Sequence, residues 1–346
     1  MPDATYGYVR SLSSADLREV SLPILMMNAF HLMQKPGSTV INTLGGLHRM
    51  AAWSGLIMTD SGGFQAYSLI RQNAKFGSLG DKGIIFYPEA SSRKLLLTPE
   101  KSIQLQMSYG SDILVCLDDC THVNASRAEQ EASVTRTLAW AARAKSSYLA
   151  QLRSRKWSEE ERPLIFAVIQ GGGELDLRRR CAEGLLEIGF DGFGFGGWPL
   201  DEDSRLPTDI LEYTRSLIPR EFPIHALGIG HPAGIVASYR LGYEMFDCAL
   251  PTRDARHGRL FTWSKSDPIL SADGDWLKFR YINSEENFRD TGPISPDCDC
   301  ECCRDYAMAY LFHLYRMRDP GYMRLATKHN LRFMTRLIER LRAQNA

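Results

Sequence analysis

The sequence contains no run of about 18 apolar residues, which a helix needs in order to cross a membrane. Its N-terminus lacks the basic and then apolar pattern of a secretory signal peptide. It also carries no net charge, because 41 lysines and arginines balance 41 aspartates and glutamates. No global charge therefore indicates a nucleic acid partner. Together these absences predict a soluble, cytoplasmic protein that does not bind a membrane.

Charge and cysteine are unevenly distributed near the C-terminus. Acidic residues outnumber basic ones over residues 264–303, whereas basic residues dominate from 304 to the end. A basic helical face is most often a solvated surface, but it can also follow phosphates. In a reducing compartment, crowded cysteines suit a metal ion better than disulfides. Four of the eight cysteines are crowded in this way: Cys298, Cys300, Cys302 and Cys303.

Short apolar runs alternate along the chain with longer amphipathic segments. This alternation predicts a parallel sheet with helices between its strands. The predicted strands are residues 23–28, 56–60, 112–118, 164–170, 190–197, 223–229 and 245–250. The predicted helices are residues 99–109, 126–152, 175–188, 209–217 and 233–241. A short first strand near Tyr8 brings the number of strands to eight and favours a closed barrel over an open sheet.

We therefore predict an α/β protein with an eight-fold β/α (TIM) barrel over residues 1–260. Residues 261–346 are predicted to form a metal-binding subdomain, inserted near the last strand and helix, and the C-terminal helices. At 346 residues and 44% hydrophobic content, the chain can bury the core that such an architecture needs.

Polar or glycine-rich clusters follow most of the predicted strands. In a β/α barrel the C-terminal ends of the strands converge on one face, where the active site is built. The clusters therefore predict a pocket with three carboxylates, one carboxamide and closely approaching backbone. Its residues at the strand ends are Asp60, Asp118, Gln170, Gly196, Gly197 and Asp247.

Asp247 interrupts an otherwise apolar run. A carboxylate that leaves water must be paired, hydrogen-bonded or used in chemistry. A simple alternative is that Asp247 caps a turn or pairs with Arg253. The recurrence of polar groups at other strand ends favours the functional interpretation.

The predicted pocket suits a flat heterocycle with hydrogen-bonding edges. Asp118 can accept from an amidine-like edge, Gln170 can donate and accept, and glycine backbone can approach a ring closely. Phe64 and Leu227 are placed to sandwich such a ring.

Two carboxylates, Asp60 and Asp247, then remain for chemistry on whatever is attached to the heterocycle. A pair of carboxylates flanking a glycosidic bond supplies a nucleophile and an acid/base for retaining substitution.

Five ordered motifs resemble those of the tRNA-guanine transglycosylase (queuine/archaeosine tRNA-ribosyltransferase) family, the base-exchange enzymes of queuosine and archaeosine biosynthesis. They are DSGGFQ at residues 60–65, QGG at 170–172, GIG at 228–230, FDCALPTR at 246–253, and Cys-x-Cys-x-x-Cys at 298–303. The resemblance covers nearly the whole chain. It implies a bacterial-like pentosyltransferase that lacks the family's usual N-terminal segment.

The resemblance also implies roles for individual residues. Asp247 matches the nucleophile that attacks the anomeric carbon of ribose as guanine departs, and Asp60 matches the general acid/base. Arg253 and Arg256 match positions that engage the anticodon loop. The positions matching the base-recognition set and its stacking walls are Asp118, Gln170, Gly196, Gly197, Phe64 and Leu227.

A structural zinc ion is implied as well, because three thiolates and one imidazole make a closed tetrahedral site. Spacing alone leaves Cys302 and His313 as alternative ligands. The residues that match the family's Zn²⁺ ligands are Cys298, Cys300, Cys303 and His329.

The run GGWPL at residues 196–200 departs from the family pattern, which has Leu and a small residue in place of Trp198 and Pro199. Proline has no N–H. The peptide before Pro199 can therefore present only the Trp198 carbonyl to a base substituent, which favours an aminomethyl deazaguanine over a nitrile base. Cys120 and Leu200 match positions that keep the pocket small, which argues against the bulky queuine.

The implied partners are tRNA, a free 7-deazaguanine base and a second copy of the chain in a homodimer. The acidic segment 264–303 leaves open the same chemistry on DNA or on a small sugar. An alternative of another class is a noncatalytic partner subunit that only binds RNA. Such a subunit would tolerate loss of the three pocket carboxylates, but this sequence retains them. His225 is interpreted as a packed or hydrogen-bonded residue, and Cys248 as a small buried hydrophobe.

Overall fold

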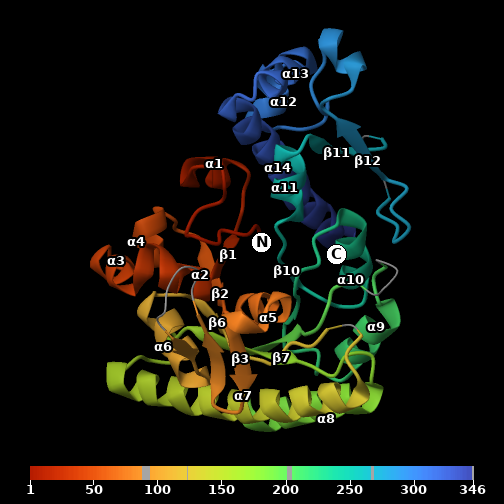
Figure 1. The fold of residues 1–346 in the computed structure, drawn as a ribbon. Helices are drawn as coiled ribbons and strands as arrows, with labels where there is room; N and C mark the ends of the chain where they lie inside the picture. The colour runs from red at the N-terminus through yellow and green to blue at the C-terminus, as the bar shows by residue number, and fades with distance from the viewer. Residues whose placement is uncertain (88–93, 123, 201–204, 266–268, 345–346) are drawn as a thin grey trace.

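A seven-stranded parallel sheet forms the centre of the protein, in the order β1-β2-β6-β7-β8-β9-β10 (Figure 1). The computed structural model describes residues 1–87, 94–122, 124–200, 205–265 and 269–344. The strands are β1 (Ile24–Asn28), β2 (Leu56–Asp60), β6 (Ile113–Val115), β7 (Leu164–Ile169), β8 (Gly192–Phe195), β9 (Ile224–Ala226) and β10 (Met245–Phe246). Each lies within a segment predicted to be a strand.

Residues 2 and 3 close the sheet into a barrel. Pro2 forms a parallel bridge with Cys248, just beyond β10, and Asp3 forms one with Met26 in β1. These residues therefore fill the eighth position between the last strand and the first. The prediction of an eight-fold β/α barrel is confirmed, but the prediction of its first strand near Tyr8 is wrong. A two-residue bridge is too short to show the alternation by which strands are recognised.

Helices between the strands cover the outside of the barrel. The main ones are α6 (Pro99–Ser108), α7 (Arg127–Arg155), α8 (Leu175–Ile188), α9 (Thr208–Ser216) and α10 (Pro232–Arg240). Their starts follow local chemistry: Thr98 caps α6 before a proline, and Ser126 forms a capping box with Glu129. No helix of the described ranges is both long and apolar enough to span a bilayer.

Three antiparallel strands interrupt the β/α order after α5 (Gly63–Gln72): β3 (Gly77–Gly80), β4 (Gly83–Phe86) and β5 (Leu95–Leu97). Four short helices also precede or follow β1: α1 (Ser14–Glu19), α2 (Ala29–Leu32), α3 (Ser38–Thr43) and α4 (Leu47–Ala51). The sequence interpretation did not include these elements, because each is too short to establish a period.

The C-terminal segment begins after α11 (Leu250–Arg256) with the antiparallel pair β11 (Arg259–Trp263) and β12 (Leu277–Tyr281). It continues through η3 (Glu285–Arg289), α12 (Glu301–Asp305), α13 (Met308–Arg316) and α14 (Pro320–Gln344). Figure 1 shows α12 and α13 at the end of the molecule remote from α7 and α8. Leu337 and Leu341 of α14 pack into the barrel core, so this helix joins the two regions. The division of the chain at residue 260 stays a prediction.

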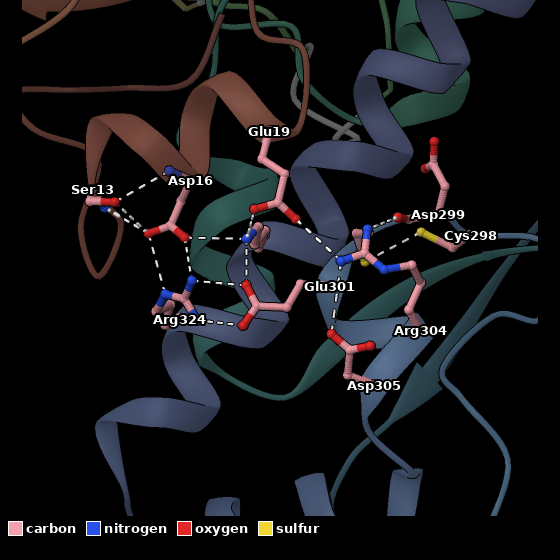
Figure 2. Close-up of polar contacts among 11 residues, drawn as sticks. Ser13, Asp16, Glu19, Cys298, Asp299, Glu301, Arg304, Asp305 and Arg324 are labelled. Atoms are coloured by element: carbon pink, nitrogen blue, oxygen red, sulfur yellow. Dashed lines mark hydrogen bonds and ion pairs between the residues drawn. The ribbon is translucent and has the colours of Figure 1, made fainter.

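An ionic network centred on a buried lysine ties α1 to this C-terminal segment. Lys328 on α14 is fully buried, and its Nζ donates to carboxylates of Asp16 and Glu19 on α1 and of Glu301 on α12. Figure 2 shows these three acids, with Arg324 bridging Asp16 and Glu301. Because the Lys328 ammonium group lies between the three carboxylates, these ion pairs hold α1, α12 and α14 together.

Candidate active site

A cavity of about 490 Å³ opens where the C-terminal ends of the barrel strands meet. Its walls come from segments far apart in the sequence, as the barrel prediction required. The predicted site residues that line it are Asp60, Phe64, Asp118, Cys120, Gln170, Gly196, Gly197, Leu227 and Asp247.

Asp60 ends β2 beside Asn28, its register partner on β1. The Asn28 amide donates to Oδ2 of Asp60 at 2.5 Å, while the backbone N–H groups of Ala29 and Gly62 donate to Oδ1, each at 3.1 Å. Burial nevertheless outweighs these hydrogen bonds and raises the pKa of Asp60 to about 7. A carboxyl group with this pKa can give and take a proton near neutral pH.

The pKa of Asp247, just beyond β10, is shifted in the opposite direction. Burial is the largest single influence and raises its pKa, but the hydrogen bond and electrostatic interaction with His225 and the hydrogen bond from Gly228 together lower the pKa below its ordinary value. His225 Nε2 lies 2.7 Å from Oδ1, and the N–H of Gly228 donates to the same oxygen at 3.0 Å. Among the described residues no donor contacts Oδ2. Asp247 is thus held as a carboxylate with one oxygen available for attack.

A carboxylate and an amide lie together on the wall formed by the ends of β6 and β7. Gln170 Nε2 donates to Oδ2 of Asp118 at 2.7 Å, and burial raises the pKa of Asp118 to about 7. The buried Oε1 of Gln170 has no hydrogen-bond partner within the described structure. A Cβ at Gly196 would lie 2.5 Å from Gln170 Nε2, so only glycine leaves this amide in place. The wall can accept and donate hydrogen bonds along the edge of a ring.

Aromatic and apolar groups line the rest of the cavity. Phe64 and Leu227 both contribute to the lining, as predicted. Trp198 also lines it and contacts the Phe64 ring edge-to-face, with centroids 5.9 Å apart. Burial raises the pKa of the Cys120 thiol, which keeps it protonated. Leu200 is 46% exposed and does not contribute to the cavity lining.

Arg253 and Arg256 lie on α11, the helix that follows Asp247 in the sequence. Neither arginine lines the cavity. Arg253 is exposed and Arg256 is half-buried. Burial and the nearby charges of Arg10 and Arg253 lower the pKa of Arg256. The charge of Asp3, which lines the cavity, acts on the pKa of Arg256 in the opposite direction, so Arg256 lies near a residue of the cavity wall.

The predicted metal ligands converge in the C-terminal segment. One ligand atom from each lies within 4.8 Å of all the others, and all four residues are buried: Cys298, Cys300, Cys303 and His329. His329 Nδ1 is 3.2 Å from the Cys303 sulfur, while its Nε2 donates to the Phe261 carbonyl at 2.8 Å. That second hydrogen bond leaves the Nδ1 lone pair facing the thiols, which fits a metal ligand. Cys302 and His313 are not part of the cluster.

Sequence reasoning missed several residues of the site. His225 is hydrogen-bonded, as interpreted, but its partner is Asp247 itself. Asn28, Gln65 and Cys248 line the cavity and were not assigned to it. Asn28 precedes a short helix whose N–H it accepts, and that N-cap pattern was the available signal.

The fold and cavity define a β/α-barrel protein with a buried Cys3His cluster near its C-terminus that could hold a metal ion. A family model described as queuine tRNA-ribosyltransferase matches residues 1–344. Proteins of that name from Psychrobacter sp. and Lysinibacillus sphaericus are each 36% identical over 99% of the chain and 84% and 83% of their own length. The same-named protein of Solidesulfovibrio magneticus is 37% identical, over 99% of the chain and 85% of its own length.

The chain belongs to the queuine tRNA-ribosyltransferase family, and with it to the pentosyltransferases.

Proposed function

We propose that this protein replaces guanine in tRNA by a 7-deazaguanine, in the queuosine pathway, through a covalent glycosyl-aspartate intermediate. The observation that carries this proposal is the pair of carboxylates facing one cavity with opposite pKa shifts. When the surroundings shift the pKa values of two carboxyl groups in opposite directions, the group with the lowered pKa can act as the nucleophile and the group with the raised pKa as the acid/base. The family name of the relatives supports tRNA as the acceptor.

In the first half of the reaction, Oδ2 of Asp247 attacks the anomeric carbon of ribose. The bond to guanine breaks, its electron pair stays with the base, and protonated Asp60 supplies a proton to the leaving group. In the second half, ionised Asp60 takes a proton from the incoming base, which attacks the same carbon and releases Asp247. Two substitutions at one carbon retain its configuration.

The wall that carries Asp118 and Gln170 suits recognition of both bases. Asp118 would accept from the donor edge, while the Gln170 amide and the backbone at Gly197 would bind the carbonyl side. Phe64 and Leu227 would sandwich the ring. Because the exchanged nucleotide must leave its stack, at a cost of a few kcal/mol, contacts of Arg253 and Arg256 with the anticodon-loop phosphates would offset that cost.

The decisive experiment offers radiolabelled guanine to the protein with unmodified tRNA, DNA or nucleoside diphosphate sugars. Labelling of tRNA alone supports the proposal. Labelling of DNA or of a sugar instead would refute tRNA as the acceptor. The homodimer stays a prediction that sedimentation can test.

The peptide between Trp198 and Pro199 supports an aminomethyl-type incoming base, since both residues line the cavity and this peptide has no N–H. We expect 7-aminomethyl-7-deazaguanine to outcompete the nitrile base severalfold. Replacing Pro199 with Ala restores an N–H and should narrow that preference. Competitive exchange with both bases measures the ratio, and a wild-type preference for the nitrile base would contradict the hypothesis. The size argument against queuine now depends on Cys120, because Leu200 does not line the cavity.

We further propose that the Cys3His cluster binds a structural zinc ion. Four protein ligands leave no open position, so zinc would stabilise the fold without taking part in the reaction. Zinc-binding energy is folding energy in such sites, on the order of 10 kcal/mol in isolated zinc modules. Replacing Cys303 with Ser should abolish stoichiometric zinc and lower the unfolding temperature of the C-terminal segment before that of the barrel. The matched control is Cys302→Ser, which should retain zinc; loss of zinc only in this control would refute the ligand set.

A further inference from the structure

Arg178, near the start of α8, is a buried cation with no acidic partner among the residues that the structure describes. Its side chain is 2% exposed, and none of the described carboxylates forms an ion pair with it. The guanidinium carbon lies 4.4 Å from the ring centroid of Phe195. Burial lowers the pKa of Arg178 to about 10, so the group stays charged at neutral pH. A positive charge at this end of a helix also opposes the helix dipole.

Three backbone carbonyls offset that cost. Arg178 Nε donates to the Gly172 carbonyl at 2.7 Å, Nη2 to that of Gly196 at 3.0 Å, and Nη1 to that of Ile169 at 3.3 Å. Ile169 ends β7 and Gly172 lies in the loop after it, so the two residues lie on either side of Gln170. Gly196 begins the loop after β8. One side chain therefore joins the two loops that form the hydrogen-bonding wall of the cavity.

The hydrogen bond to Gly196 sets the direction of the next N–H. In a trans peptide the carbonyl and the N–H point opposite ways. Because the Gly196 carbonyl faces Arg178, the N–H of Gly197 faces the other side, where it reaches the thiol of cavity-lining Cys120. Gly197 has φ of +105°, which glycine adopts without strain.

We propose that Arg178 is a positioning residue that fixes the Gln170 and Gly197 loops and so determines the affinity of the cavity for its base. This inference rests on the proposed function. Only the planar fork of arginine supplies three donors in fixed directions, which lysine cannot reproduce. A preformed wall spares the base the cost of ordering two loops when it binds.

Arg178→Lys keeps the charge and removes the fork. We expect it to weaken binding of guanine and of 7-aminomethyl-7-deazaguanine to the free protein by about 10- to 100-fold, measured by calorimetry. The KM for the free base should rise by the same factor, while kcat at saturating base changes by less than about fivefold. If the lysine variant does not fold, Arg178→Gln is measured with the same expectation.

Arg215 on α9 provides a matched control. It is 5% exposed, has no ion pair in the described ranges, donates to the Ile218 carbonyl at 2.9 Å and does not line the cavity. Arg215→Lys should lower the unfolding temperature without changing base affinity. Wild-type affinity in Arg178→Lys, or equal weakening in both variants, would overturn the inference. Failure of the wild-type protein to bind either base would instead refute the proposed function.

Discussion

Replacing Asp247 with Asn should lower the rate of base exchange by about 10⁴-fold or more, because an amide is a poor nucleophile. The variant is nearly isosteric. Its amide oxygen can still accept from His225 and Gly228, which both bind Oδ1 in the wild-type protein. Only Oδ2, the oxygen proposed to attack the ribose, is replaced by an amide nitrogen. A covalent adduct with labelled tRNA, trapped by denaturation, should form with the wild-type protein and not with the variant.

Asp254→Asn is the control for this experiment. Asp254 lies on α11, pairs with Arg259 and does not line the cavity. Its variant should exchange bases within about twofold of the wild-type rate, because this half-buried pair lies outside the cavity lining. Exchange that persists in Asp247→Asn would eliminate the covalent mechanism. It would also revive the alternative in which the fold only binds RNA.

Asp60→Asn should slow guanine release by about 10²- to 10⁴-fold, the usual contribution of a general acid. The pH dependence follows from the pKa of about 7. Protonated Asp60 is the form that donates to the leaving base, so release should be constant below pH 7 and fall about tenfold per unit above it. Single-turnover release of labelled guanine between pH 5 and 9 measures this profile.

The Asp60→Asn variant should lose the alkaline fall together with most of the rate. A second variant tests the cause of the pKa shift. Asp3 lines the same cavity, and its charge contributes to the raised pKa of Asp60. Asp3→Asn should therefore move the alkaline fall to lower pH. An unchanged profile in Asp60→Asn would show that another group donates the proton.

Segments with a clear period were predicted closely. β2 and α8 have the bounds predicted for residues 56–60 and 175–188. β10 is shorter than the predicted segment 245–250, because α11 begins at Leu250 with Pro251 in its first turn. The closure by residues 2 and 3 could not be predicted, since it depends on where the first and last strands meet in space.

The candidate site likewise contains residues that the sequence predicted and contacts that it could not. Residues at strand ends were predicted, because the direction of parallel strands brings those ends to one face. The partnership of His225 with Asp247 was not, because it depends on the placement of a neighbouring strand. The three carbonyls around Arg178 come from the end of β7 and from the loops after β7 and β8, so no local pattern indicates them.

The sequence by itself determined the longer periodic strands and helices and the positions of the carboxylates at strand ends, because periodicity is a local property of a chain. Only the tertiary structure decided how those carboxylates differ. The pKa of Asp60 is raised by burial, while His225 and Gly228 hold the pKa of Asp247 low. Burial and hydrogen-bond geometry arise from segments that meet only in the folded barrel, so the division between acid and nucleophile is a property of the fold.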